Sequence, residues 1–200
     1  MERLKPWLVG LVMAGCVAYY VHDRAAERRA LRSGPVAELP VQSSANQSAL
    51  QRAGYVIEPL ASYDVRARVL SIERYRIGRE ADLSPLDFAL GWGPMSDAAV
   101  LDRLTISQSN RWYQFRWEGS PPIDPALMAK SSANTHLVPA SESVRSRLLN
   151  VNKGEIVRLS GYLVNVRHSD GWAWRSSLTR DDTGGGSCEL MWVTDVQVEQ

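Results

Sequence analysis

The sequence has few cysteines and histidines and almost no net charge. It holds two cysteines and three histidines in 200 residues. Cys16 lies in an apolar N-terminal segment and Cys188 near the other end, so a disulfide between them is not expected. A formal net charge of +1 provides no bulk field for a polyanion, and nucleic acid is therefore not an expected ligand. The chain also lacks an internal repeat and any motif that specifies a reaction.

Phenylalanine is scarce as well, with two residues against seven tryptophans and seven tyrosines. Indole and phenol rings bury apolar area while offering an N–H or O–H at the rim, which suits a small β domain or a binding face. With 44% hydrophobic and 22% charged residues, the composition is that of a chain that can bury a core. The length predicts one soluble domain with an appendage.

The appendage is an apolar N-terminal segment. Residues 7–21 carry no charge and are flanked by charged residues on both sides. As a helix this segment spans ~23 Å, against ~30 Å for a hydrocarbon core, and Lys5 and Trp7 extend its reach at the interface. We predict an uncleaved membrane helix within residues 1–32, which holds the protein in the bacterial inner membrane as a single pass. The expected partners are the membrane, through residues 7–21, and other envelope proteins.

Two alternatives remain open for this segment. Residues 13–16, Met-Ala-Gly-Cys, resemble a bacterial lipobox, in which Cys16 would become the lipidated first residue of a mature lipoprotein. A cleaved secretory signal or a soluble core helix is the other interpretation. Basic residues after position 21 outnumber those before it, so the positive-inside rule does not favour an exported domain. A leader followed by one domain nevertheless indicates a periplasmic location, which we adopt as the prediction.

The rest of the chain divides into a linker and a domain. Residues 33–54 contain two prolines and a Ser/Asn/Gln cluster, which predicts a flexible tether, and residues 55–200 are predicted to form the β-rich soluble domain. Alternating apolar and polar residues predict strands at 63–75, 111–117, 155–166, 172–178 and 188–198. Capping residues and prolines predict helices at 85–90, 97–104, 125–130 and 142–149, and a loop or edge segment at 131–139.

These elements predict a mainly β domain with short helices, of the α+β class, preceded by one N-terminal membrane helix. A small antiparallel or mixed barrel or sandwich would accommodate the strands. We favour an OB-like five-stranded barrel, with the helix after Ser141 closing one end. Val144, Leu148 and Val151 form the apolar stripe that would face the domain.

Several short sequences together resemble a family of uncharacterised bacterial proteins. They are GWGPMSD at 91–97, SQSNR at 107–111, ANTHLVP at 133–139 and SSLTRDDTGGGSCE at 176–189. The resemblance covers residues 55–196. It implies an N-terminal membrane segment followed by one domain, and it implies no activity and no catalytic residues.

The first candidate site pairs the Cys188 thiol with His136. An imidazole can lower a thiol pKa and orient a nucleophile, and Asn134, two residues before the histidine, would orient the imidazole. His136 and Cys188 are therefore the catalytic candidates. The alternative is that Cys188 is a small core residue of the last strand and that His136 bonds loop backbone.

The second candidate site is acidic. The segment Arg180-Asp181-Asp182 with Glu189, and Asp97 from elsewhere, would offer the hard oxygens of its carboxylates to a divalent cation. Their spacing does not match a calcium-binding loop, and the following glycines are typical of a hairpin loop with positive φ angles. We therefore expect neither a metal nor a cofactor.

The third candidate site is aromatic. The aromatic and basic strand Arg111 to Trp117 carries Trp112 and Trp117, and Trp172, Trp174 and Arg175 would lie opposite it if the barrel closes. In OB-like folds such faces stack bases or sugars. The alternative is that these rings form a core rich in tryptophan and tyrosine.

We predict a non-enzymatic, membrane-anchored envelope protein whose β domain is a binding or assembly module. The alternative is a membrane-anchored hydrolase that uses His136 with Cys188 or with the acidic cluster of Asp97, Asp181 and Glu189. If the domain has a site, one set of residues should converge on a single cleft: Asn134, His136, Ser177, Arg180 and Glu189.

Overall fold

The computed structural model describes residues 13, 17, 33–179 and 186–199, and these residues form a mainly β domain with short helices, as predicted. The strands are β1 (Val41–Ser44), β2 (Leu50–Arg52), β3 (Tyr55–Arg74), β4 (Leu86–Gly91), β5 (Thr105–Ser109), β6 (Trp112–Arg116), β7 (Ser132–Pro139), β8 (Ile156–His168), β9 (Ala173–Trp174) and β10 (Glu189–Glu199). The helices are α2 (Arg79–Leu83), α3 (Ala98–Leu101), α4 (Pro125–Lys130), α5 (Glu142–Leu149) and the 3₁₀ helix η1 (Gly93–Ser96).

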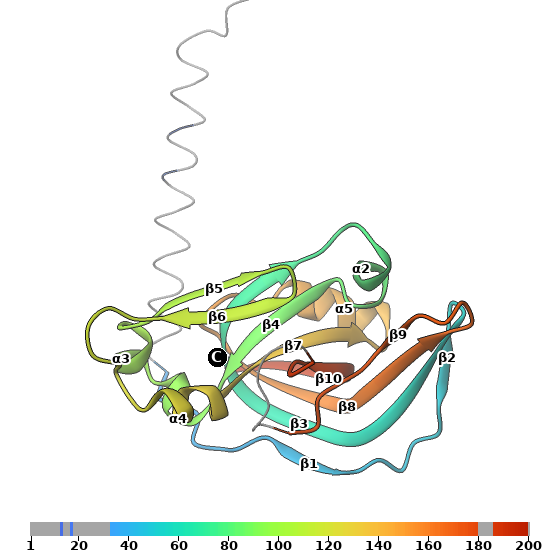
Figure 1. Cartoon of the computed structure of the whole chain (residues 1–200), viewed down its shortest axis with the longest axis horizontal. Coiled ribbons are helices and arrows are strands. Elements are labelled where there is room, and N and C mark those ends of the chain that lie inside the picture. Colours follow the sequence, from blue (N-terminus) through green and yellow to red (C-terminus); the bar gives the residue numbers. More distant parts are fainter. Residues whose placement is uncertain (1–12, 14–16, 18–32, 180–185, 200) are drawn as a thin grey trace, which may run out of the picture.

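The main sheet is mixed and contains a closed ring of hydrogen-bonded strands. β3, β4, β7, β10 and β8 pair in this order, and β8 returns to pair with β3. Only the β7–β10 pair of the ring is parallel. β1 and β2 add to β3, and β9 adds to β8, which gives the eight strands of this sheet (Figure 1).

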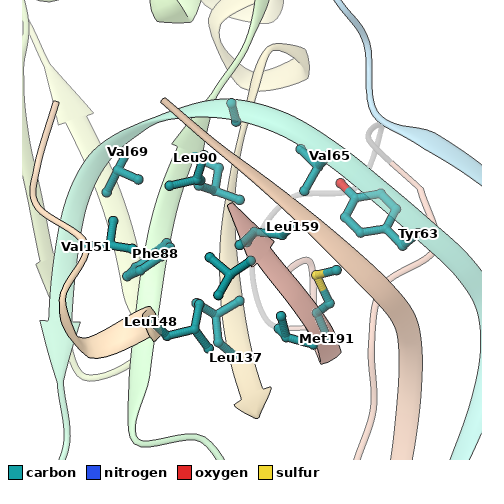
Figure 2. Close-up of a cluster of buried hydrophobic side chains, with 14 of the residues drawn as sticks. Tyr63, Val65, Val69, Phe88, Leu90, Leu137, Leu148, Val151, Leu159 and Met191 are labelled. Atoms are coloured by element: carbon teal, nitrogen blue, oxygen red, sulfur yellow. The ribbon is translucent and has the colours of Figure 1, made fainter. Parts of the chain in front are cut away.

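The main core lies on the inward faces of the ring strands. Figure 2 shows Phe88 of β4 and Leu137 of β7 meeting Leu148 of α5, and these side chains are fully buried. Val144 and Val151 belong to the same cluster, so the predicted apolar stripe of this helix does face the domain. The capping prediction is also confirmed, because the Ser141 hydroxyl accepts a hydrogen bond from the Val144 N–H.

Two predictions of local structure are wrong, and the predicted strand at 172–178 is reduced to the two residues of β9. Residues 85–90 were expected to form a helix, yet Leu86–Gly91 is the buried strand β4. Its residues alternate between the core and the outer face, which is the period-2 pattern of a strand. The segment therefore forms a strand although Ser84 and Pro85 are typical of a helix start. Residues 131–139 were expected to be a loop or an edge segment, and Ser132–Pro139 is β7, a strand with neighbours on both sides. Its polar side chains misled that prediction because their partners come from distant segments.

The segment at 33–54 also differs from the predicted tether. It contributes β1 and β2 to the sheet, and Val36 is fully buried in the main core. Arg68 of β3 is fully buried, and burial lowers the pKa of its guanidinium. This group donates hydrogen bonds to the carbonyl oxygens of Ser33, Gly34, Ser96 and Gly154. The start of the segment is therefore fixed to the sheet.

A separate hairpin, β5–β6, lies across β4 (Figure 1). Its inner side chains, Tyr113 and Phe115 among them, pack in one cluster with Ala89 of β4. The two residues of its turn, Asn110 and Arg111, have φ angles of 52° and 69°, which a two-residue type I′ turn requires. The hairpin therefore projects Arg111 from a rigid tip.

In the part of the chain that the structure describes, no helix has the length and apolar character to cross a membrane. The predicted anchor at residues 7–21 falls outside the described residues except for positions 13 and 17. The membrane helix and the inner-membrane location stay predictions.

Candidate functional site

The candidate site lies on the outer face of β4 and β7, away from the main core. Phe88 of β4 and Leu137 of β7 point into that core. Side chains alternate along a strand, so Asp87, His136 and Asn134 point to the opposite face. Asp87 and His136 are directly paired in the β4–β7 register, and all three side chains are buried.

Asp87 is the centre of this cluster, since both of its carboxylate oxygens are engaged. Oδ1 accepts a hydrogen bond of 2.6 Å from Nη1 of Arg111. Oδ2 accepts from the Tyr75 hydroxyl at 3.1 Å and from Nδ2 of Asn134 at 3.4 Å. Nδ1 of His136 lies 2.9 Å from Oδ2 but is not aligned for a hydrogen bond. A fully buried carboxylate needs such partners because its desolvation is otherwise very costly.

Arg111 closes the cluster from the hairpin side. Its guanidinium lies 3.7 Å from the centroid of the Tyr75 ring and donates to the Ser84 carbonyl oxygen at 2.9 Å. Its main chain is held as well, because the N–H donates to the Tyr75 hydroxyl and the carbonyl oxygen accepts from Asn134. A planar guanidinium can pair with a carboxylate and stack on a ring at once, which a lysine cannot do. The hairpin tip is therefore docked onto β4 and β7.

A row of aromatic rings runs beside the cluster. Centroid distances are 4.9 Å for His136–Trp174, 6.2 Å for Trp174–Trp172, 5.7 Å for Trp172–Tyr55 and 4.8 Å for Tyr55–His168. The Arg111 guanidinium lies 5.1 Å from the Trp174 ring, and that of Arg79 lies 5.4 Å from the Trp172 ring. Both tryptophans are half-buried. The row thus presents a surface of rings and cations next to the buried carboxylate.

The structure does not show the expected arrangement, in which Asn134 orients the His136 imidazole beside the Cys188 thiol. Sγ of Cys188 lies 3.7 Å from Nδ2 of Asn134 and 3.8 Å from the carbonyl oxygen of Arg111. The Asn134 amide bonds to the hairpin through Arg111 and through Gln108, whose Nε2 donates to Oδ1 at 2.7 Å. Asn134 therefore orients the hairpin tip rather than an imidazole. His136 is a strand residue beside Asp87, and the expectation that it bonds loop backbone is wrong.

Of the predicted set of five residues, Asn134 and His136 lie on one face of the sheet and Glu189 lies on the other. Glu189 is buried and in phase with Met191, a main-core residue, so it points inward, away from Asn134. Ser177 forms a local turn, in which its hydroxyl accepts from the Thr179 N–H at 3.1 Å. Arg180, Asp181 and Asp182 lie outside the described residues.

The acidic candidate site has no counterpart in the described part of the chain. Asp97 caps α3, where Oδ1 accepts from the Ala99 N–H at 2.9 Å. Within residues 33–179 and 186–199, no three His, Cys, Asp or Glu side chains group in a way that could hold a metal ion.

The two hairpin tryptophans have different surroundings. Trp117 is half-buried in the cluster under the hairpin and stacks on Phe115 with 6.3 Å between centroids. Trp112 lies on the other face and is 47% exposed. The core interpretation thus fits Trp117, and the surface interpretation fits Trp112.

Sequence reasoning missed Asp87 and Tyr75 as site residues, and it named Arg111 only as the first residue of the aromatic and basic strand 111–117. Asp87 was assigned to a helix and Arg111 to a strand. One signal could have found Arg111: the residues on both sides of Asn110-Arg111 alternate, and asparagine favours the positive φ angle of a two-residue turn. No local signal identifies Tyr75, because its partners are far along the chain.

The burial of the Tyr75 hydroxyl predicts that the protein becomes less stable at alkaline pH. Burial, with help from the Asp87 charge, raises the pKa of its hydroxyl well above the usual value. Below about pH 10 the hydroxyl is protonated in both states, so its contribution is fully present. Above that pH the unfolded chain releases the proton while the folded chain keeps it, so the free energy of unfolding falls as pH rises. Tyr75→Phe should flatten this decline in urea unfolding followed from pH 8 to 11, and equal slopes for the two proteins would contradict the assignment.

Together these groups form a closed polar cluster beside a partly exposed aromatic surface. Its hydrogen bonds fix the hairpin, and the rings and guanidiniums around it can stack on or pair with another molecule. No family model, curated protein or solved structure matches this chain. Geometry and sequence therefore carry the functional argument.

Proposed function

We propose that this protein is a membrane-anchored envelope protein whose β domain is a binding or assembly module. The observation that carries the proposal is the exposed Trp112 beside the docked Arg111. Arg111 is held by Asp87, Tyr75 and Ser84, so the neighbouring tryptophan is presented on a rigid tip. Rigid, partly exposed tryptophans and arginines are the side chains that contribute most to protein interfaces.

The chemistry of the cluster also favours binding over catalysis. Both oxygens of Asp87 accept hydrogen bonds, and the Asn134 amide is engaged at its nitrogen and its oxygen. A catalytic base or nucleophile has to reach a substrate atom within hydrogen-bond distance. Here the groups reach one another and the hairpin backbone, so the cluster supports the position of the tip.

We further propose that the ring of strands is an OB-like barrel. Counted in chain order, β4 and β7 are the second and third strands of the ring, and α5 lies between the third strand and the fourth, β8. In OB folds the face of strands two and three, with the flanking loops, is the usual binding surface. This correspondence supports a binding surface where Asp87 and Trp174 lie.

Residues 7–21 would hold the domain at the inner membrane, with the domain on the periplasmic side. The apolar length and the flanking charges of the sequence support this part of the proposal. It predicts that the binding partner is itself an envelope protein.

Substitution of Trp112 tests the binding surface. The full chain is tagged, expressed in its native host and purified from detergent-solubilised membranes as wild type and as Trp112→Ala. We expect a specific envelope protein to co-purify with the wild type and its recovery to fall about tenfold in the variant, as for an interface tryptophan.

Val198→Ala is the matched control, since Val198 is a similarly exposed apolar side chain (43%) at the far end of β10. It should leave recovery unchanged. The binding proposal would be overturned if no partner co-purifies with the wild type, or if both variants lose the partner equally.

One observation favours the alternative of a hydrolase. Nδ1 of His136 lies 2.9 Å from Oδ2 of Asp87, which places an imidazole beside a carboxylate as in the bases of many hydrolases, although the two atoms are not aligned for a hydrogen bond. His136→Gln would abolish hydrolysis in that case. In a binding module it would leave partner recovery close to that of the wild type, so the two functions separate in one variant.

A further inference from the structure

A second site lies at the end of the sheet where α2, β2 and α5 come close together. A pocket of ~490 Å³ opens there, which is within the size range of small-ligand sites. Its walls include Arg52 at the end of β2, Arg76 after β3 and Arg145 of α5, together with Tyr75, Asp82 and Pro139. The exposed tryptophan of the hairpin tip is not among the lining residues, although the pocket shares Tyr75 with the cluster that holds Arg111.

The pocket is positively charged. Its lining contains three guanidiniums and one carboxylate, that of Asp82, and the three arginines come from separate segments of the chain. Arg145 also pairs with Glu142 at 3.2 Å, a contact open to solvent and therefore weak. Among the described residues, neither Arg52 nor Arg76 forms an ion pair. The cations in this concave site thus exceed the anions that could neutralise them.

Two of the walls are fixed before any ligand arrives. Nη1 of Arg52 donates to the Pro139 carbonyl oxygen at 2.5 Å, and its guanidinium lies 5.7 Å from the centroid of the Trp192 ring. Tyr75 is held by its hydrogen bond to Asp87 and by the Arg111 guanidinium on its ring. A site whose groups are already positioned loses less conformational entropy on binding.

We propose that this pocket binds a phosphate-type dianion, either the phosphoryl group of a small soluble molecule or the phosphomonoester headgroup of a lipid. Three guanidiniums approaching from different segments match an anion that has oxygens on several sides. A carboxylate offers two oxygens, which one guanidinium fork already satisfies.

Pyrophosphate is a suitable probe, used with the full chain in a neutral detergent. Thermal unfolding is followed as pyrophosphate is added and is compared with sodium chloride at equal ionic strength. We expect a saturable rise of the unfolding midpoint with pyrophosphate, because a ligand that binds the folded state stabilises it. Arg76→Gln should weaken the apparent affinity about tenfold, the effect of losing one charge-assisted contact.

Arg116→Gln on β6 is the matched control, since Arg116 is exposed, like Arg76, and lies outside the pocket. It should leave the affinity unchanged. Arg145→Gln provides a second test should Arg76→Gln fail to fold. The proposal is overturned if pyrophosphate acts no differently from chloride, or if Arg116→Gln weakens binding as much as the pocket variants. Neither result depends on co-purification through the hairpin tip.

The source of the phosphate is resolved in nanodiscs. The titration is repeated in phosphatidylcholine with and without phosphatidic acid, whose headgroup is a phosphomonoester. Competition by phosphatidic acid that Arg76→Gln abolishes assigns the pocket to a headgroup. If the pyrophosphate affinity is the same in nanodiscs with and without phosphatidic acid, the pocket is assigned to a soluble phosphate.

Discussion

Asp87→Ala is expected to lower the free energy of unfolding by roughly 3–5 kcal/mol, the range for breaking a buried ion pair from one side. The fully buried carboxylate is the common partner of Arg111, Tyr75 and Asn134. Without it the mostly buried guanidinium keeps its contacts with Ser84 but loses its counter-ion. Urea unfolding of the full chain in neutral detergent measures the effect, and the docked hairpin should become accessible to proteases.

Two further variants separate the ion pair from the loss of a side chain. Asp102→Ala removes an exposed carboxylate at the end of α3 and should change stability by less than about 0.5 kcal/mol. In a double-mutant cycle, Asp87→Ala combined with Arg111→Ala should cost less than the sum of the two single variants, because no unpaired charge remains. Additive costs would show that the two side chains are not coupled as the structure indicates.

The fold was predictable from the sequence where local pattern and tertiary surroundings agree. β8 has a continuous period-2 pattern, and α5 has a capping serine and an apolar stripe, so both were found. The prediction for β4 was wrong because Ser84 and Pro85 are residues typical of a helix start. In the structure Ser84 is instead buried, and its hydroxyl donates a hydrogen bond to the Leu86 carbonyl oxygen. Such a conflict between local signal and burial is decided by long-range packing, which one sequence does not display.

The site was predictable only in part, for a similar physical reason. Asn134 and His136 were chosen as candidates, and the structure places them on one face beside Asp87. Cys188 approaches the same face at the Asn134 amide. Arg111 and Asp87, which organise these groups, are 24 residues apart and meet through a hairpin that folds back across β4. Their pairing depends on tertiary topology, and neither residue type is unusual in its local sequence.

The closure of the ring depends on a close approach of two main chains at Gly161. A Cβ atom at this position of β8 would lie 1.9 Å from the Trp192 carbonyl oxygen of β10 and 3.2 Å from the Thr194 nitrogen. The register pairs Val193 with Gly161 and Asp195 with Ser160, so Thr194 is the extra residue of a β-bulge. The two main chains come this close at a position of β8 that has no side chain. Glycine is thus required here for space and not for an unusual φ angle.

Gly161→Ala is therefore expected to destabilise the domain by about 3 kcal/mol or more, the upper end for inserting a methyl group into packed structure, because a backbone carbonyl has to move. Gly34→Ala is the matched control, since a Cβ there meets no atom within 4 Å. It should be neutral or slightly stabilising through the unfolded state. Urea midpoints of the two variants in detergent provide the comparison. If Gly161→Ala unfolds at the wild-type midpoint, β8 and β10 do not approach as closely as the ring requires, and the binding face that we propose on β4 and β7 would lose its support.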